Sequence, residues 1–136
     1  MDSSHPLSEK DKELIELARA ASQNAYAPYS RFEVGAALLT VDERIFTGCN
    51  VENTSLGLTV CAERTATYAA VCHGSTQFQK LVIVVNQQNP SLPCGACRQV
   101  LHEFSPELEI LAIGNTGKIL RAKLTELLPN AFQYKP

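Results

Sequence analysis

A continuous apolar run, Leu81-Val82-Ile83-Val84-Val85, most restricts the folds open to this chain. Every position is aliphatic and most are β-branched, so we expect a strand that is covered on both faces. Segments with helical and with strand patterns alternate around this run. The sequence therefore predicts an α/β protein, a three-layer α/β/α sandwich around a five-stranded mixed sheet.

The other elements follow from apolar spacing and from the positions of Pro and Gly. The first helix is predicted to be capped by Ser8, to include Ala25 and to end before Pro28. The remaining helices are predicted at 61–72, from 93 to near 106, and at 125–128. The strands are predicted at 34–39, 45–51, 81–85, 109–113 and 118–122. Small residues at 35–37 allow another element to pack closely on the first strand.

Length and charge limit the organisation and the partners of the chain. Its 136 residues are enough for one domain, 1–136, and leave no room for a second full one. We expect residues 1–7 to be a flexible N-terminus. A formal net charge of −2 disfavours a nucleic-acid binder. With no run of about 20 apolar residues and no signal-peptide pattern at the start, we expect a cytoplasmic protein without a membrane partner.

The chain has five cysteines, which in a reducing compartment are not expected to form a framework of disulfides. An odd number cannot pair completely within one chain, so metal binding or catalysis is the more informative hypothesis. Their positions are Cys49, Cys61, Cys72, Cys94 and Cys97.

Cys94 and Cys97 lie three residues apart in the first turn of a predicted helix, and Cys61 directly precedes another helix. Three thiolates suit a catalytic zinc site, because the fourth position of the tetrahedron stays open for water. The spacing alone also permits a structural zinc site, a redox pair or simply buried thiols. Possible fourth ligands, none at a short ligand spacing, are Cys49, Cys72, His73 and His102. We expect Cys49 and Cys72 to be small buried hydrophobic residues.

Charged residues accompany the cysteines. Glu63 projects about 200° around the helix from Cys61, so it would lie beside the open position and move protons rather than ligate the ion. The alternative is an ordinary acidic residue in the first turn of a helix. Arg64 and Arg98 each follow a motif residue. We hypothesise that Arg64 donates hydrogen bonds to ligand sulfurs and so keeps the bound water acidic; the alternative is a surface arginine.

Together, Cys61-Ala62-Glu63 and Pro93-Cys94-Gly95-Ala96-Cys97-Arg98 resemble the paired motifs of the zinc nucleoside and nucleobase deaminases. The first metal motif begins with a cysteine, Cys61. In this the chain resembles the short-chain cytidine deaminases rather than the relatives that carry a histidine at that position. The resemblance extends over nearly the whole chain. It also includes Tyr26-Ala27-Pro28-Tyr29-Ser30, Phe32-Glu33-Val34-Gly35-Ala36-Ala37, Gly48-Cys49-Asn50-Val51-Glu52-Asn53 and Leu127-Leu128-Pro129-Asn130-Ala131-Phe132.

The resemblance implies a role for each matching residue. Cys61, Cys94 and Cys97 would bind one Zn²⁺ per subunit, with Glu63 as the catalytic acid and base. Asn50 and Glu52 would bind the ribose hydroxyls, Phe32 would pack on the pyrimidine, and backbone groups near Ala62 and Cys94 would hold the base. Phe132 would enter a neighbouring subunit's site in a homotetramer with composite sites.

Without the resemblance, Asn50 and Glu52 would indicate a solvated polar face, and Phe32 and Phe132 would indicate core positions. One position departs from the family pattern: Leu56 stands where many relatives carry an aromatic residue. This puts any stacking contributed by that loop in doubt.

We therefore expect zinc-dependent hydrolytic deamination of cytidine and 2′-deoxycytidine, with Glu63 transferring protons. The alternatives are a deaminase of another cytosine nucleoside such as blasticidin S, a non-enzymatic zinc-binding interaction module, and a polynucleotide deaminase. The absence of a basic cluster argues against the last of these.

Overall fold

The computed structural model describes residues 6–136. Its helices are α1 (Glu9–Ser22), α2 (Ala62–Cys72), α3 (Gly95–Phe104) and α4 (Leu124–Leu127), with a 3₁₀ turn η1 at Leu56–Leu58. The strands are β1 (Val34–Thr40), β2 (Ile45–Cys49), β3 (Phe78–Val85), β4 (Glu109–Ile113) and β5 (Ile119–Lys123). Most of the expected N-terminal segment, residues 1–5 of 1–7, lies outside the described residues, whereas Leu7 packs against buried side chains.

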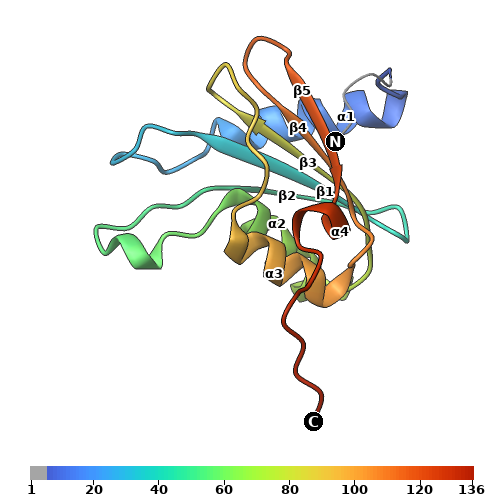
Figure 1. Cartoon of the computed structure of the whole chain (residues 1–136). Helices are drawn as coiled ribbons and strands as arrows, with labels where there is room; N and C mark the ends of the chain where they lie inside the picture. The colour runs from blue at the N-terminus through green and yellow to red at the C-terminus, as the bar shows by residue number, and fades with distance from the viewer. Residues whose placement is uncertain (1–5) are drawn as a thin grey trace.

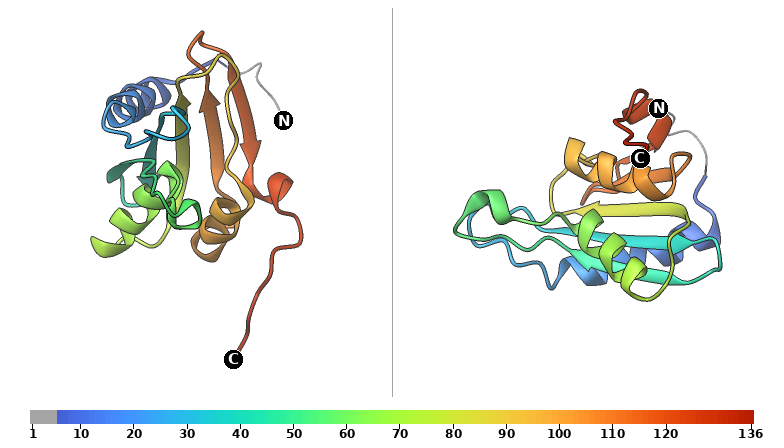
Figure 2. Two further views of the ribbon diagram at one scale, coloured as in Figure 1. Left: turned by 90° about the vertical axis from the view of Figure 1, so that its left-hand side faces the viewer. Right: turned by 90° about the horizontal axis from the view of Figure 1, so that it is seen from below.

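The predicted five-stranded mixed sheet is confirmed, with the strand order β2-β1-β3-β4-β5. β3 and β4 are parallel, while the other neighbouring pairs are antiparallel. Helix α1 lies on one face of this sheet, and α2 and α3 lie side by side on the other (Figures 1 and 2). The α/β/α arrangement is therefore also confirmed.

Strand β3 separates two apolar cores, because its alternate side chains point to opposite faces. Leu81, Ile83 and Val85 pack in one core with the alanines of α2 and with Leu101 of α3. Val82 and Val84 pack in the other core against Leu14, Ile15 and Ala18 of α1. All five β3 side chains are at most 2% exposed, as the apolar run predicts. No helix within residues 6–136 is long and apolar enough to cross a membrane.

Two glycines allow helices to approach the sheet from opposite sides. A Cβ atom added at Gly35 of β1 would lie 1.9 Å from the carbonyl oxygen of Ala18 in α1. One added at Gly48 of β2 would lie 2.5 Å from the backbone nitrogen of Ala66 in α2. Neither position has room for a larger residue. The close packing predicted for the first strand thus occurs, and a second glycine brings α2 against β2.

The predicted cap of the first helix is confirmed: Ser8 and Asp11 form a capping box. The predicted end is wrong, because α1 stops at Ser22 and does not include Ala25. Beyond the helix the chain turns and pairs with the segment after β2, where the N–H of Tyr26 donates to the carbonyl oxygen of Asn50. This pairing uses backbone groups that a longer helix would have needed.

Smaller differences occur elsewhere. Helix α4 begins and ends one residue earlier than predicted, and η1 was not expected. Gly74, the predicted terminator of α2, has a φ of 89°, a conformation that glycine adopts without steric cost. After α4 the chain has no regular structure, and it extends away from the body of the molecule (Figures 1 and 2).

Candidate metal centre and active site

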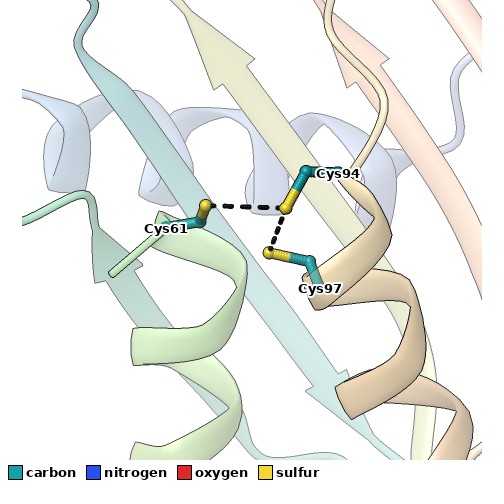
Figure 3. Close-up of side chains that lie close together, drawn as sticks. All are labelled: Cys61, Cys94 and Cys97. Carbon is teal, nitrogen blue, oxygen red and sulfur yellow. Dashed lines mark hydrogen bonds between the residues drawn. The ribbon is translucent and has the colours of Figure 1, made fainter. Parts of the chain in front are cut away.

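The three predicted ligands lie together where α2 and α3 begin. Cys61 is the N-cap residue of α2, Cys94 is the N-cap residue of α3, and Cys97 lies in the first turn of α3. The Sγ atoms of Cys61 and Cys94 are 3.8 Å apart, and those of Cys94 and Cys97 are 3.6 Å apart. Figure 3 shows the three side chains pointing toward one another from the two helices.

These distances fit one zinc ion. Ligand sulfurs at about 2.3 Å from a tetrahedral zinc stand about 3.8 Å from one another. Neither N-cap cysteine uses its side chain to cap its helix, so both sulfurs remain available as ligands. Within residues 6–136, no histidine, carboxylate or further cysteine joins the group. A three-sulfur set favours a catalytic over a structural zinc site, because one position stays open.

The surroundings of Cys61 favour its thiolate form, which is the form that binds metals. A hydrogen bond from Cys97 and the guanidinium group of Arg64 lower the pKa of Cys61 to about 5. The pKa of Cys97 is raised, because it hydrogen-bonds Cys61 and is buried.

The two motif arginines differ. Arg64 Nη2 donates to Cys61 Sγ at 3.4 Å, which is the contact that the sequence hypothesis assigned to this residue. Its Nε is buried without a hydrogen-bond partner, so a donor beside the thiols is left unsatisfied. Arg98 instead donates to the carbonyl oxygens of Pro93, at 2.6 Å, and Leu127, at 3.0 Å. Arg98 thus ties the start of α3 to the end of α4.

Glu63 lies in the first turn of α2 and is 6% exposed. Burial, and to a smaller extent the charge of Cys61, raises its pKa to about 7. A carboxyl group with such a pKa can both accept and donate a proton near neutral pH. Glu63 is not part of the group that could hold the metal. Its burial also argues against the alternative of an ordinary solvated acid at a helix start.

A cavity of about 220 Å³ opens onto Cys61, Glu63 and Cys94. This is smaller than the roughly 300–1,000 Å³ of drug-sized sites, which suits a small ligand. The cavity also includes six residues that the sequence interpretation did not place in the site. Its complete lining is Ser30, Phe32, Val34, Asn50, Glu52, Thr59, Cys61, Ala62, Glu63, Ile83, Ser91, Leu92 and Cys94.

Asn50 and Glu52 both line this cavity but also bind the backbone of the preceding loop. Asn50 is 7% exposed; its amide donates to the carbonyl oxygen of Phe32 at 2.6 Å and accepts from the N–H of Val34 at 3.0 Å. Glu52 accepts hydrogen bonds from Tyr29 and Ser30. Asn50 is therefore not on a solvated face, and both residues hold the segment that carries Phe32.

The remaining predicted residues lie in different surroundings. Ala62 is fully buried at the cavity, and Phe32 is half-buried between the cavity and the core. Phe132 is 73% exposed on the C-terminal segment and does not line the cavity of its own chain, so the alternative of a core position is wrong. Leu56, on η1, is also highly exposed.

The two cysteines outside the cluster do not both behave as expected. Cys49 is partly buried at the end of β2, whereas Cys72 is exposed. The expected burial is wrong for Cys72, because the last turn of α2 presents it to solvent. All five cysteines are free.

Sequence reasoning did not assign a role to Ser30 or Thr65. The Ser30 hydroxyl lies between Glu52 and Phe32. Thr65 Oγ1 donates to the carbonyl oxygen of Cys49 at 2.8 Å and so joins α2 to β2. Ser30 belongs to a recognised motif and could have been found through it, whereas nothing in the local pattern distinguishes Thr65.

Comparison with known proteins decides the family. The profile described as "Cytidine and deoxycytidylate deaminase zinc-binding region" matches residues 8–113, which include the three cysteines and Glu63. The chain belongs to this deaminase family. The zinc that the sulfur geometry accommodates is the metal of the family's zinc-binding region.

Individual members of the deaminase family are similar over most of the chain. A cytidine deaminase of Halalkalibacterium halodurans is 47% identical over 120 residues, which are 88% of this chain and 91% of the relative. The crystal structure of a cytidine deaminase from Burkholderia pseudomallei has a TM-score of 0.85 at 48% identity, covering 89% of this chain and 98% of that one. A blasticidin-S deaminase of Bacillus cereus is 30% identical over 131 residues, 90% of this chain and 92% of the relative.

Proposed function

We propose that the protein is a zinc-dependent cytidine deaminase, which hydrolyses cytidine to uridine and 2′-deoxycytidine to 2′-deoxyuridine with release of ammonia. The observation that carries the proposal is the position of buried Glu63 beside a three-cysteine cluster, at a cavity of about 220 Å³. Such a reaction belongs to pyrimidine salvage in the cytoplasm.

Cys61, Cys94 and Cys97 hold one zinc ion per subunit. Bound zinc acts as a Lewis acid that makes water a nucleophile at neutral pH. Arg64 offsets the negative charge of the thiolates through its contact with Cys61. This charge compensation supports hydrolysis, because three thiolates alone would disfavour ionisation of the water.

Glu63 transfers the protons of the reaction. It takes a proton from water and delivers it to N3 of the pyrimidine ring, which makes C4 electrophilic. The hydroxide left from the water adds to C4. Glu63 then moves the proton of this new hydroxyl group to the amino group, which leaves as ammonia as the C4 carbonyl forms. A carboxyl pKa of about 7 supports both directions of transfer. Water supplies the oxygen that the product carries at C4, so the reaction requires no oxidant or other co-substrate.

The other cavity residues orient the nucleoside. Phe32 packs on the pyrimidine, and backbone groups near Ala62 and Cys94 hold its polar edge. Asn50 and Glu52, which line the same cavity, bind the sugar hydroxyls. Glu52 is ionised at neutral pH, because the Ser30 hydroxyl and two backbone N–H groups lower its pKa. An ionised carboxylate is a strong acceptor for a sugar hydroxyl.

We further propose a homotetramer in which Phe132 completes the site of a neighbouring subunit. Phe132 supports this assembly, because its ring is exposed while its carbonyl oxygen accepts a hydrogen bond from Gln99 of α3 at 2.9 Å. Leu56 and Leu58 of η1 are exposed apolar residues that such an assembly would also cover.

The test is a zinc-quantified assay of ammonia release from cytidine, 2′-deoxycytidine, cytidine monophosphate and blasticidin S. We expect turnover of both nucleosides at one zinc per chain. A clear preference for blasticidin S would instead support the other cytosine nucleoside deaminases, to which the chain has 30% identity. Zinc binding without ammonia release from any substrate would contradict the proposal and favour a non-enzymatic zinc module.

A further inference from the structure

We propose that Ser30 is a positioning residue for sugar recognition: its hydroxyl aims the Glu52 carboxylate at the nucleoside's 3′-hydroxyl and fixes the backbone of Phe32. The inference rests on the proposed function, because it concerns the same cavity. It adds a residue and a specificity to that function.

Three donors converge on the Glu52 carboxylate. Oε1 accepts from the backbone N–H of Tyr29 at 2.9 Å and from that of Ser30 at 3.2 Å. Oε2 accepts from the Ser30 hydroxyl. Two bonds to one oxygen and one to the other fix the plane of the carboxylate. An oxygen of a carboxylate has two acceptor positions, so Oε2 keeps one for a ligand.

The same hydroxyl also binds the backbone of Phe32. It accepts from the Phe32 N–H at 3.0 Å, while the Asn50 amide donates to the Phe32 carbonyl oxygen at 2.6 Å. Both polar backbone groups of Phe32 are therefore held by side chains that line the cavity. Ser30 thus connects the residue proposed to contact the sugar with the residue proposed to pack on the base.

The loop that carries Ser30 and Phe32 needs these hydrogen bonds, because its backbone is strained at one residue. Arg31, between Ser30 and Phe32, has a φ of 61°, in the left-handed region that non-glycine residues rarely adopt. The N–H of Arg31 donates to the carbonyl oxygen of Ala27 at 3.0 Å, and Asn86 donates to the carbonyl oxygen of Arg31 at 3.0 Å. Strained positions of this kind persist where neighbouring contacts determine them, often at ligand sites.

The 3′-hydroxyl is the ligand group that this arrangement selects. Cytidine and 2′-deoxycytidine are both proposed substrates, and the 3′-hydroxyl is the ribose-ring hydroxyl that they share. A carboxylate fixed by Ser30 meets this hydroxyl without losing further side-chain freedom on binding. Without the Ser30 hydroxyl, Oε2 loses its partner, and only the two backbone hydrogen bonds to Oε1 still hold the Glu52 carboxylate.

The test compares cytidine with 3′-deoxycytidine in the wild type and in Ser30→Ala. We expect the wild type to prefer cytidine to 3′-deoxycytidine by roughly 10- to 100-fold in kcat/KM, because only cytidine donates a hydrogen bond from its 3′-hydroxyl to the charged Glu52 carboxylate. In Ser30→Ala we expect this preference to fall at least fivefold, through a higher KM for cytidine, while kcat stays within about threefold, because the lost contact is remote from the reacting atoms.

Two further variants separate positioning from stability. Ser30→Thr keeps the hydroxyl and should restore the preference for cytidine. Ser55→Ala removes another exposed loop serine, whose side chain makes no cap bond to η1, and should leave the preference unchanged. If Ser30→Ala does not fold, Ser30→Cys carries the test, because it keeps the size of serine but only a weak donor.

The outcomes distinguish this inference from the proposed function. If Ser30→Ala lowers kcat/KM for both substrates by the same factor, Ser30 has only a structural role and the inference is wrong. A wild type that deaminates cytidine without preferring it to 3′-deoxycytidine overturns the inference and leaves the proposed function intact. A wild type that deaminates neither substrate contradicts the proposed function and, with it, the inference.

Discussion

Helices α2 and α3 begin alike and then differ in what they contribute to the site. Each starts after an N-cap cysteine in extended conformation, with φ and ψ of −72° and 154° at Cys61 and −68° and 171° at Cys94. The first turn of α2 then supplies buried Glu63 and the contact of Arg64 with a thiol. The first turn of α3 supplies a second thiol, Cys97, and a link to the C-terminal segment through Arg98.

This difference shows that the same local structure, a cysteine at a helix N-cap, can contribute to the site in two ways. At α2 it combines a proposed zinc ligand with the group that we propose transfers protons. At α3 it combines two proposed ligands with an anchor for the segment that carries Phe132. The residues that follow in the first turn, Glu63 in α2 and Cys97 in α3, decide what each helix contributes. Substitutions at equivalent positions of the two helices should therefore have different effects.

The largest effect is expected for a ligand of α3. Cys94→Ala removes one of three sulfurs, so the protein should lose bound zinc and more than 99% of its activity, an effect of about 10²-fold or more. Zinc content by metal analysis and ammonia release would be measured together. The matched control is Cys72→Ala, another exposed cysteine, outside the cluster. A Cys94→Ala protein with a full equivalent of zinc would rule out this ligand assignment.

Intermediate effects on zinc affinity and turnover are expected when the two arginines are substituted, and these effects should differ between α2 and α3. Arg64→Ala removes the donor to Cys61 Sγ and should weaken zinc affinity or turnover by about 10- to 100-fold, as is typical of groups that orient metal ligands. Arg98→Ala should change zinc affinity by less than about threefold, because Arg98 binds backbone carbonyl oxygens instead.

Competition with a chromogenic chelator measures zinc affinity in both arginine variants. Limited proteolysis of the C-terminal segment provides the second measurement, and we expect faster cleavage only in Arg98→Ala. Equal loss of zinc affinity in the two variants would show that the arginines are equivalent and that the contrast between the helices is wrong.

The smallest effect is expected where α2 rests on the sheet. In Gly48→Ala the new Cβ would lie 2.3 Å from Thr65 Oγ1 and 2.7 Å from the carbonyl oxygen of Ala62, so α2 must move. We expect a loss of about 1–3 kcal/mol in the free energy of unfolding. Gly57→Ala is the control, because no atom lies within 4 Å of its added Cβ. Equal stability of the two variants in urea would contradict the close packing of α2.

Much of the fold could be predicted, because its elements follow local patterns. The apolar run of β3 predicted a strand covered on both faces, and Ser8 predicted the start of α1. The end of α1 could not be predicted, since it depends on pairing with residues after β2, about 25 positions further along the chain. Long-range pairing leaves no local signal.

In the site, too, the residues that follow a local pattern could be predicted and those that depend on distant contacts could not. The cysteines and Glu63 were predictable, because their chemistry requires particular residue types at particular spacings. The contact of Arg64 with a ligand sulfur was also hypothesised from the sequence. The backbone contacts of Arg98 were not, since nothing in its motif distinguishes it from a surface arginine. The dual bonding of Asn50 and the bridge made by Ser30 also required the structure, because both connect segments that are distant in sequence.

The central claim is that α2 supplies the proton-transferring group of a zinc deaminase, and Glu63→Gln tests it most directly. Zinc content and cytidine turnover would be measured on the same preparation, with Glu103→Gln, on the exposed side of α3, as the control. We predict a full equivalent of zinc and a turnover lowered by about 10²- to 10⁴-fold. Turnover within tenfold of the wild type at full zinc occupancy would contradict the claim.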